Sequence, residues 1–272
     1  MQGYLKLLEA KTIFTIREAY RRFRDRLGAL VSWGKDSVTM LYLTRKAFFG
    51  RVPIKVIHID TGYKLKEIYE FRDKLVKEWN LKLVIAKNEK ALREGMGPER
   101  GRFICCTALK TEALKQCIQK HGFKALLVAI RRDEHAIRAK ERTFSPRTHD
   151  SKWLYKEQPP ELWEHFTVKL DETRTHLRVH PMLWWREIDI WRYIKKEKIP
   201  VNPLYFSGTR KPNYRYRSLG CEPCCVPIRS NARNVDEIIK ELETTKIAER
   251  AGRVQDKEKE YMMLKLRSLG YL

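Results

Sequence analysis

Apolar residues in this chain gather into two kinds of pattern. Short continuous apolar runs bounded by turn residues are typical of buried strands, whereas apolar residues spaced three and four apart are typical of helices. The first pattern predicts strands at residues 27–31, 54–60, 81–86, 125–130 and 178–182. The second predicts helices at residues 12–26, 38–48, 63–79, 107–121, 185–197 and 234–248.

This alternation of strands and helices predicts an α/β fold. Strands separated by helices favour a doubly wound parallel sheet with right-handed crossovers. We expect a nucleotide-binding domain over residues 1–200 and a smaller, basic, cysteine-containing C-terminal part over residues 201–272. Such sheets bind ligands beyond the carboxyl ends of their strands, so the polar segments that follow strands are the candidate sites.

The charge balance is strongly basic. The chain has 57 Lys and Arg against 34 Asp and Glu, a formal net charge of +23. This excess indicates either a polyanionic partner, such as a nucleotide, an oxyanion or a nucleic acid, or a lysine-rich solvated surface. The sequence has neither an apolar run of about 18 residues nor a secretory signal, so we expect a cytoplasmic protein without a membrane span.

The loop between the first predicted strand and its helix has the features of a phosphate site. It reads Ser32-Trp33-Gly34-Lys35-Asp36-Ser37. Gly34 lets the backbone approach an anion, and the first amides of the helix point unpaired N–H groups at it. Lys35 adds a charge, and Ser32 and Ser37 add hydroxyl donors. The alternative is that Asp36 and Ser37 only cap the helix.

This loop resembles the PP-loop of the N-type ATP pyrophosphatases, whose usual form is Ser-Gly-Gly-x-Asp-Ser. Trp33 departs from the first Gly, but the small subunits of bacterial sulfate adenylyltransferases tolerate a large residue there. The chain resembles that family along nearly its entire length. The matching stretches are His58-Ile-Asp-Thr-Gly-Tyr63, Tyr69-Glu-Phe-Arg-Asp73, Arg131-Arg-Asp-Glu134, Arg138-Ala-Lys-Glu-Arg142, Pro159-Pro-Glu-Leu-Trp163, Asp189-Ile-Trp191, Pro203-Leu-Tyr205, Ser218-Leu-Gly-Cys221 and Glu249-Arg-Ala-Gly-Arg-Val254.

The resemblance implies an adenine nucleotide alpha hydrolase-like fold and cleavage of ATP, with Mg²⁺, between its α- and β-phosphates. It implies catalytic roles for Lys35, Ser37, Arg138 and Arg142. It also implies an ATP-binding set made of Ser32, Gly34, Lys35, Asp36, Ser37, Asp60, Arg131 and Arg132. Asp60 either meets the ribose or a Mg²⁺-linked water, or caps the following helix.

Cations follow directly on the strand that ends at Ile130. Guanidinium groups bind sulfate and phosphate oxygens through paired parallel donors, so this segment is a candidate oxyanion site. Its members are Arg131, Arg132, Arg138, Lys140 and Arg142. Which of them meets the α-phosphate and which the acceptor stays open. Arg250 and Arg253 are weaker candidates for the same pocket.

Five of the six cysteines form two clusters. Cys105-Cys106 and Cys221-x-x-Cys224 resemble the [4Fe–4S] ligand set of adenylylsulfate reductases, and a Cys₄ zinc site is the alternative. Cys225 is a spare thiol that could replace Cys224 as a ligand or lie buried. Cys117 lies on an apolar helical stripe where we expect an inert buried thiol. Those reductases use a further cysteine near the C-terminus, and none follows Cys225 here.

We therefore expect adenylyl transfer from ATP to sulfate, giving adenylyl sulfate and pyrophosphate. An alternative is a sulfur-insertion enzyme acting on DNA or tRNA, because the loop at 207–217 interleaves cations (Arg210, Lys211, Arg215, Arg217) with aromatic residues. The same loop could instead be a solvated surface loop. That loop is shorter than the corresponding insertion of the sulfate-activating subunits. An adenylylsulfate or PAPS reductase and a non-enzymatic ATP sensor are less favoured. A GTPase subunit or a second copy of the chain is the expected partner.

Overall fold

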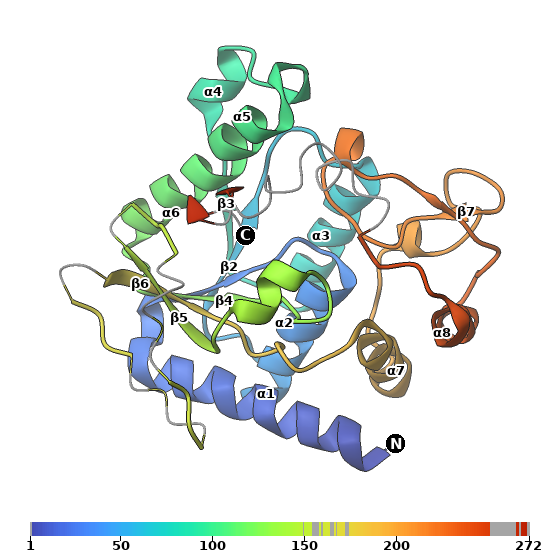
Figure 1. Cartoon of the computed structure of the whole chain (residues 1–272), viewed down its shortest axis with the longest axis horizontal. Coiled ribbons are helices and arrows are strands. Elements are labelled where there is room, and N and C mark those ends of the chain that lie inside the picture. Colours follow the sequence, from blue (N-terminus) through green and yellow to red (C-terminus); the bar gives the residue numbers. More distant parts are fainter. Residues whose placement is uncertain are drawn as a thin grey trace.

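The computed structural model describes residues 2–148, 150–153, 158, 160–163, 166, 168–171, 174–250, 265–266 and 268–270. Its centre is a six-stranded sheet in the order β3-β2-β1-β4-β6-β5 (Figure 1). All neighbouring pairs are parallel except the last, in which β5 runs antiparallel to β6 at one edge. The strands are β1 (Leu27–Leu30), β2 (Lys55–Ile59), β3 (Leu83–Ala86), β4 (Ala125–Val128), β5 (Phe144–Thr148) and β6 (Arg174–Val179), with a separate ribbon of β7 (Tyr214–Arg215) and β8 (Ile228–Arg229).

Both faces of the sheet are buried. Ala29 and Leu127 belong to a larger apolar cluster on one face, whereas Leu30 and Leu126, their neighbours along the strands, belong to a smaller cluster on the other. Successive side chains of a strand point to opposite faces, so strands covered on both sides are apolar throughout. This explains why β1 and β4 read as continuous apolar runs.

Helices cover both faces. The larger cluster includes residues of α1 (Gln2–Phe23), α2 (Lys35–Ala47), α3 (Lys66–Glu78) and α7 (Glu187–Glu197), and the smaller one includes α6 (Ala113–His121). Further helices are α4 (Glu89–Arg93), α5 (Arg102–Cys106), the π-helix η3 (Thr107–Glu112) and α8 (Val235–Thr244). Single 3₁₀ turns are η1 (Arg24–Arg26), η2 (Pro98–Arg100), η4 (Ala136–Lys140), η5 (Pro203–Tyr205) and η6 (Glu222–Cys224).

The predicted α/β class is confirmed. Some predicted strands and helices differ from the observed ones in presence or in boundaries. The edge strand β5 was not predicted, because Pro146 and the buried Arg147 interrupt its apolar pattern. Proline lacks the N–H that a central strand needs and is tolerated at a sheet edge. The strand β6 begins at Arg174 and ends at Val179, so it overlaps the predicted range 178–182 only at its start, and α1 begins at Gln2 rather than at residue 12. The predicted helix 107–121 begins with the π-helical turn η3.

The strand order places the predicted motifs side by side. The chain runs from β1 outward to β2 and β3 and then returns to β4 on the other side of β1, so the direction of winding changes between β1 and β4. Ligands bind at such a switch point, beyond the carboxyl ends of the strands. The phosphate loop follows β1, and Arg131 follows the end of β4. No helix in the described part of the chain is long and apolar enough to cross a membrane.

Candidate functional site

The phosphate loop lies between β1 and α2, as predicted. The cap of α2 is Gly34, and no side chain caps the helix, so the alternative that Asp36 and Ser37 are capping residues is wrong. Both lie inside the first turn. The Ser37 hydroxyl donates to the Gly34 carbonyl at 3.1 Å and lies 3.2 Å from the Ser32 hydroxyl. The loop thus presents hydroxyl groups and helix amides on one side.

Two residues of this loop have unusual backbone or packing requirements. Trp33 has a φ of 64°, in the region that favours glycine, and its side chain is completely buried. Gly34 has an ordinary φ of −84°. A Cβ at Gly34 would lie 3.1 Å from the Tyr205 hydroxyl, so glycine is needed for close approach rather than for its conformation.

A cavity of about 180 Å³ opens beside the loop. One part of its wall is apolar and comes from β1, β2 and β4 and the residues that follow β4, including Leu30, Ile57, Val128 and Ile130. The other part is polar and includes Lys35, Ser37, Glu134, Arg138, Glu249 and Arg250. An apolar wall next to a cluster of anion donors suits a ligand with a flat ring at one end and phosphates at the other.

Lys35 is buried and lies among carboxylates. Its Nζ donates to Glu249 and lies 3.1 Å from Asp36 Oδ2 and 3.9 Å from Glu187 Oε1. Burial alone would lower the pKa of Lys35, but the carboxylates of Glu249 and Glu187 outweigh it and raise the pKa above its ordinary value. The side chain is therefore a fixed positive charge at the cavity.

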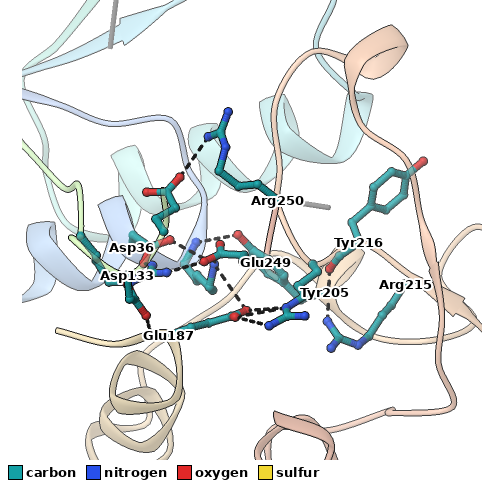
Figure 2. Close-up of polar contacts among 12 residues, drawn as sticks. Asp36, Asp133, Glu187, Tyr205, Arg215, Tyr216, Glu249 and Arg250 are labelled. Carbon is teal, nitrogen blue, oxygen red and sulfur yellow. Dashed lines mark hydrogen bonds and ion pairs between the residues drawn. The ribbon is translucent and has the colours of Figure 1, made fainter. Parts of the chain in front are cut away.

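Arg131 is completely buried and does not itself line the cavity. Its guanidinium bonds to Asp36 and Glu249, and its Nε donates to Asp133 at 2.9 Å. Burial opposes the charge of Arg131, yet Glu249 and Asp133 more than offset it and raise its pKa. Glu249, from the C-terminal part of the chain, lies at the centre of this network and bonds to both Lys35 and Arg131 (Figure 2).

The other predicted arginines separate into two groups. Arg138 lines the cavity and pairs with Glu134, which also accepts from Arg250 at 3.1 Å. Arg132 instead stacks on the exposed ring of Trp184, 4.0 Å from its centre, and Arg142 does not line the cavity. Lys140 is exposed. Arg253 lies outside the described residues.

Asp60 is placed apart from the phosphate loop. Its Oδ1 accepts from the Gly62 amide at 2.9 Å and from the Tyr69 hydroxyl at 2.7 Å, and it does not line the cavity described above. Burial raises the pKa of Asp60, but these two hydrogen bonds outweigh it and hold the pKa below its usual value. The cap of α3 is Leu65, so Asp60 stabilises the preceding turn rather than capping the helix.

Four cysteines come together as the spacing predicts. Cys105 and Cys106 on α5, and Cys221 and Cys224 around η6, line one cavity of about 10 Å³. Burial, and then the neighbouring thiols of Cys106 and Cys221, raise the pKa of Cys105 to about 12. Among the residues that the structure describes, no group of three or more His, Cys, Asp or Glu side chains is arranged as a metal site.

Two other predictions about side chains have clear outcomes. Cys117 is buried in the smaller apolar cluster, and burial raises its pKa to about 11, as expected of an inert thiol. Three of the four cations in the loop 207–217 are paired with carboxylates, whereas Lys211 is exposed and lies over the Tyr214 ring. Arg210 bonds to Glu67 and Glu222, buried Arg215 bonds to Glu241, and Arg217 bonds to Glu187.

Several residues of the cavity were not predicted. Glu249 and Tyr205 lie within stretches that resemble the sulfate adenylyltransferase subunits, and that resemblance was the available signal, but it assigned them no role. Lys64 and Lys110 also line the cavity. Their positions depend on how distant segments pack, and no local pattern marks them.

Comparison with known proteins places this site in a family. The model of the phosphoadenosine phosphosulfate reductase domain matches residues 26–227. A protein of Allorhizobium ampelinum named "Sulfate adenylyltransferase subunit 2" is 39% identical, over 100% of this chain and 94% of its own. A Marinomonas protein of the same name is also 39% identical, over 98% of this chain and 97% of its own.

Known structures share the fold at lower identity. The phosphoadenylyl-sulfate reductase of Candida auris has a TM-score of 0.56 at 18% identity and covers 83% of this chain and 98% of its own. The FMN adenylyltransferase of Candida glabrata has a TM-score of 0.56 at 16% identity, over 93% of this chain and 88% of its own. The chain therefore belongs to the phosphoadenosine phosphosulfate reductase domain family and, within it, to the sulfate adenylyltransferase subunit 2 proteins.

Proposed function

We propose that this protein transfers the adenylyl group of ATP to sulfate and releases pyrophosphate. The observation that carries the proposal is a buried, charged lysine in a strand–loop–helix anion site, next to an apolar wall at the switch point of the sheet. The name of the relatives, "Sulfate adenylyltransferase subunit 2", supports sulfate as the acceptor.

In this proposal the adenine lies against the apolar wall and the phosphates lie along the loop. The hydroxyl groups of Ser32 and Ser37 and the backbone of Gly34 and Asp36 bind and orient them, while the Asp36 carboxylate holds Lys35 and Arg131. A sulfate oxygen attacks the α-phosphorus, the bond between that phosphorus and the bridging oxygen breaks, and pyrophosphate leaves with the bonding electrons. Lys35, in the cavity wall, stabilises the charge that develops on the leaving group, which is the main contribution a protein makes to phosphoryl chemistry. Arg131 does not line the cavity and adds its positive charge from behind Glu249, to which it is bonded. Mg²⁺, when bound, supplies further neutralisation of the phosphates.

The acceptor would lie against the second pair of cations in the cavity wall. Arg138 and Arg250 both pair with Glu134, so their guanidinium groups are held in place before an oxyanion arrives. Guanidinium donors match the oxygens of sulfate. Direct ATP or acceptor contacts by Asp60, Arg132 and Arg142 stay predictions, and these three residues are not among those that line the cavity.

A nucleic-acid acceptor, with sulfur insertion as the purpose, is the second candidate. The net charge and the four clustered cysteines favour it. The carboxylate partners of Arg210, Arg215 and Arg217 count against it, because a cation that is already paired releases fewer counterions on binding.

The cysteines Cys105, Cys106, Cys221 and Cys224 are the residues that would hold a metal centre. Thiolate sulfur is the ligand of both zinc and iron–sulfur clusters. A cavity of about 10 Å³ has room for one small ion, whereas a [4Fe–4S] cluster requires the thiols to move apart. Bound metal would tie the turn at η6 to α5 and remove the penalty of bringing four thiols together.

Partners and location follow from the same proposal. The relatives are numbered as a second subunit, so a partner subunit, such as a GTPase, is expected, with a second copy of this chain as the alternative. A chain with six free cysteines that uses ATP fits the cytoplasm.

The division into residues 1–200 and 201–272 stays a prediction, and Tyr205 and Glu249 would contribute to the nucleotide site from the second part.

The decisive experiment is exchange of labelled pyrophosphate into ATP by the purified protein. We expect exchange that depends on sulfate and is lost in Ser37→Ala. Exchange stimulated by DNA or tRNA but not by sulfate would reassign the acceptor. Binding of ATP without exchange under any of these conditions would favour an ATP-sensing subunit.

A further inference from the structure

The donors of the phosphate site are bonded to the protein's own acceptors. Lys35 Nζ and the Arg131 guanidinium both bond to the carboxylate of Glu249, one to each oxygen. The backbone amide of Lys35, in the first turn of α2, donates to the Tyr205 hydroxyl at 2.8 Å. Both acceptors come from the C-terminal part of the chain, and both line the cavity (Figure 2).

This set of donors is the one that a phosphate group uses. An amide at a helix N-terminus, an ammonium group and a guanidinium group are all anion ligands, and the charged ones make the stronger hydrogen bonds. Burial alone would raise the pKa of Glu249, but Arg131 and Lys35 outweigh it and hold the pKa far below its usual range. The Glu249 side chain is therefore an anion at the anion site.

We infer that Glu249, together with the Tyr205 hydroxyl, takes the place of a phosphate group in the nucleotide-free protein, and that the phosphates of the nucleotide displace Glu249. A carboxylate and a phosphate cannot share Lys35 and Arg131 at contact distance without strong like-charge repulsion. Before the phosphates bind, Glu249 neutralises two buried cations, Lys35 and Arg131, whose charges would otherwise repel each other. It preserves the geometry of the empty site and lowers its affinity for anions.

The surroundings of Glu249 are consistent with exchange. It follows α8 in the segment Thr245–Arg250, whose Ile247 carbonyl accepts from Arg217 at 2.7 Å. On its other side, Arg250 bonds to Glu134 in the cavity wall. These contacts anchor the chain before and after Glu249 without involving Lys35 or Arg131. The side chain of Glu249 can leave the cations while its neighbours keep the segment in place.

The test is the binding of inorganic pyrophosphate to the full-length protein, measured by calorimetry without Mg²⁺. The substitution Glu249→Gln keeps the shape and removes the charge. We expect it to tighten pyrophosphate binding at least about tenfold, since one charged competitor for two cations is gone. It should also lower the unfolding temperature of the ligand-free protein. The matched control is Glu243→Gln, which removes an ion pair with Arg192 at the surface. It should alter neither the affinity for pyrophosphate nor the unfolding temperature.

A purely structural role for Glu249 predicts that stability and affinity fall together, and that result would overturn the inference. So would unchanged affinity. Should Glu249→Gln fail to fold, Tyr205→Phe frees the Lys35 amide at nearly constant volume and should tighten binding in the same direction, by a smaller factor. The inference rests on the proposed function only in that the cavity binds polyphosphate. Pyrophosphate binding without sulfate-dependent exchange would reject the proposed acceptor and leave the role of Glu249 standing.

Discussion

The indole Nε1 of Trp33 donates a hydrogen bond of 3.0 Å to Nδ1 of His58, joining the phosphate loop to the neighbouring strand β2. Both side chains are completely buried. The indole N–H can only donate, so Nδ1 is the acceptor and the proton of the neutral ring is assigned to Nε2, which has no hydrogen-bond partner, although Nδ1 also lies 3.3 Å from the Val31 carbonyl. A bulky residue at positive φ persists only where its surroundings hold it, and here His58 does so.

Protonation of His58 should therefore destabilise the fold. Burial, and then the positive charge of Lys64, lower its pKa from 6.5 to about 4. The unfolded chain binds the proton more readily, so the contribution of His58 is fully present above pH 6.5 and is lost as the pH falls towards 4. We expect a loss of about 2 kcal/mol of unfolding free energy between pH 7.5 and pH 5 from this residue.

Urea unfolding of the wild type and of His58→Gln at both pH values measures this contribution. The variant should be less stable at pH 7.5 and should show a smaller loss on acidification. The control His121→Gln changes a half-buried histidine on α6. Burial lowers the pKa of His121 too, but by less than that of His58, so this variant should lose less of the pH dependence than His58→Gln does. Equal slopes for wild type and His58→Gln would show that the ring does not resist protonation.

The phosphate loop should be sensitive to single side chains. Lys35→Ala and Ser37→Ala should each lower the rate of pyrophosphate exchange at least about tenfold, because a charge-assisted phosphate contact contributes roughly 1.5–3 kcal/mol. The control Lys46→Ala alters a half-exposed lysine further along α2, paired with Glu9 and Glu197. Exchange at the wild-type rate in both loop variants would remove the loop from the active site.

The two catalytic arginines predicted from the sequence can be separated by experiment. Arg138 lines the cavity and Arg142 does not, so Arg138→Ala should raise the sulfate concentration needed for half-maximal exchange. We expect a change of at least about tenfold for Arg138→Ala and little change for Arg142→Ala. ATP binding, measured separately, should be altered far less than the sulfate dependence. A larger effect of Arg142→Ala would mean that the acceptor lies outside this cavity.

Elements set by local sequence could be predicted, whereas features set by contacts between distant residues could not. The loop 32–37 and strands β1 and β4 could be predicted because local apolar runs end in polar motifs. The edge strand β5 could not be predicted, because a strand accommodates Pro146 and Arg147 only where it lies at the edge of the sheet. The role of Glu249 depends on a contact with Lys35 between residues 214 positions apart, which no local pattern encodes. Ion pairs over such distances are decided by the packing of the whole chain.

The cysteine cavity supports a last prediction, concerning bound metal. Burial, and then neighbouring thiols, raise the pKa of Cys105 and of Cys224, which share one cavity with Cys106 and Cys221, and a metal ion offsets this by binding the thiolates. Anaerobically purified protein should contain bound metal at a fixed ratio of metal ions to protein chains. A brown protein with about four irons would identify a [4Fe–4S] cluster, and a colourless protein with one zinc would identify a Cys₄ zinc site.

Variants at the cysteines test whether the metal joins the two segments. Cys221→Ser should lose the metal and unfold at a lower temperature, because η6 would then be joined to α5 only by weaker contacts such as the 3.2 Å bond from Arg102 to the Pro223 carbonyl. The control Cys117→Ala changes a thiol in the apolar cluster of α6 and should keep the full metal content, with a modest loss of stability from the small cavity it leaves. Metal-free wild-type protein that is as stable as metal-loaded protein would mean that the four thiols meet by packing alone. In that case Cys221→Ser should lower stability no more than Cys117→Ala does, so the two variants together decide between a metal centre and a thiol cluster.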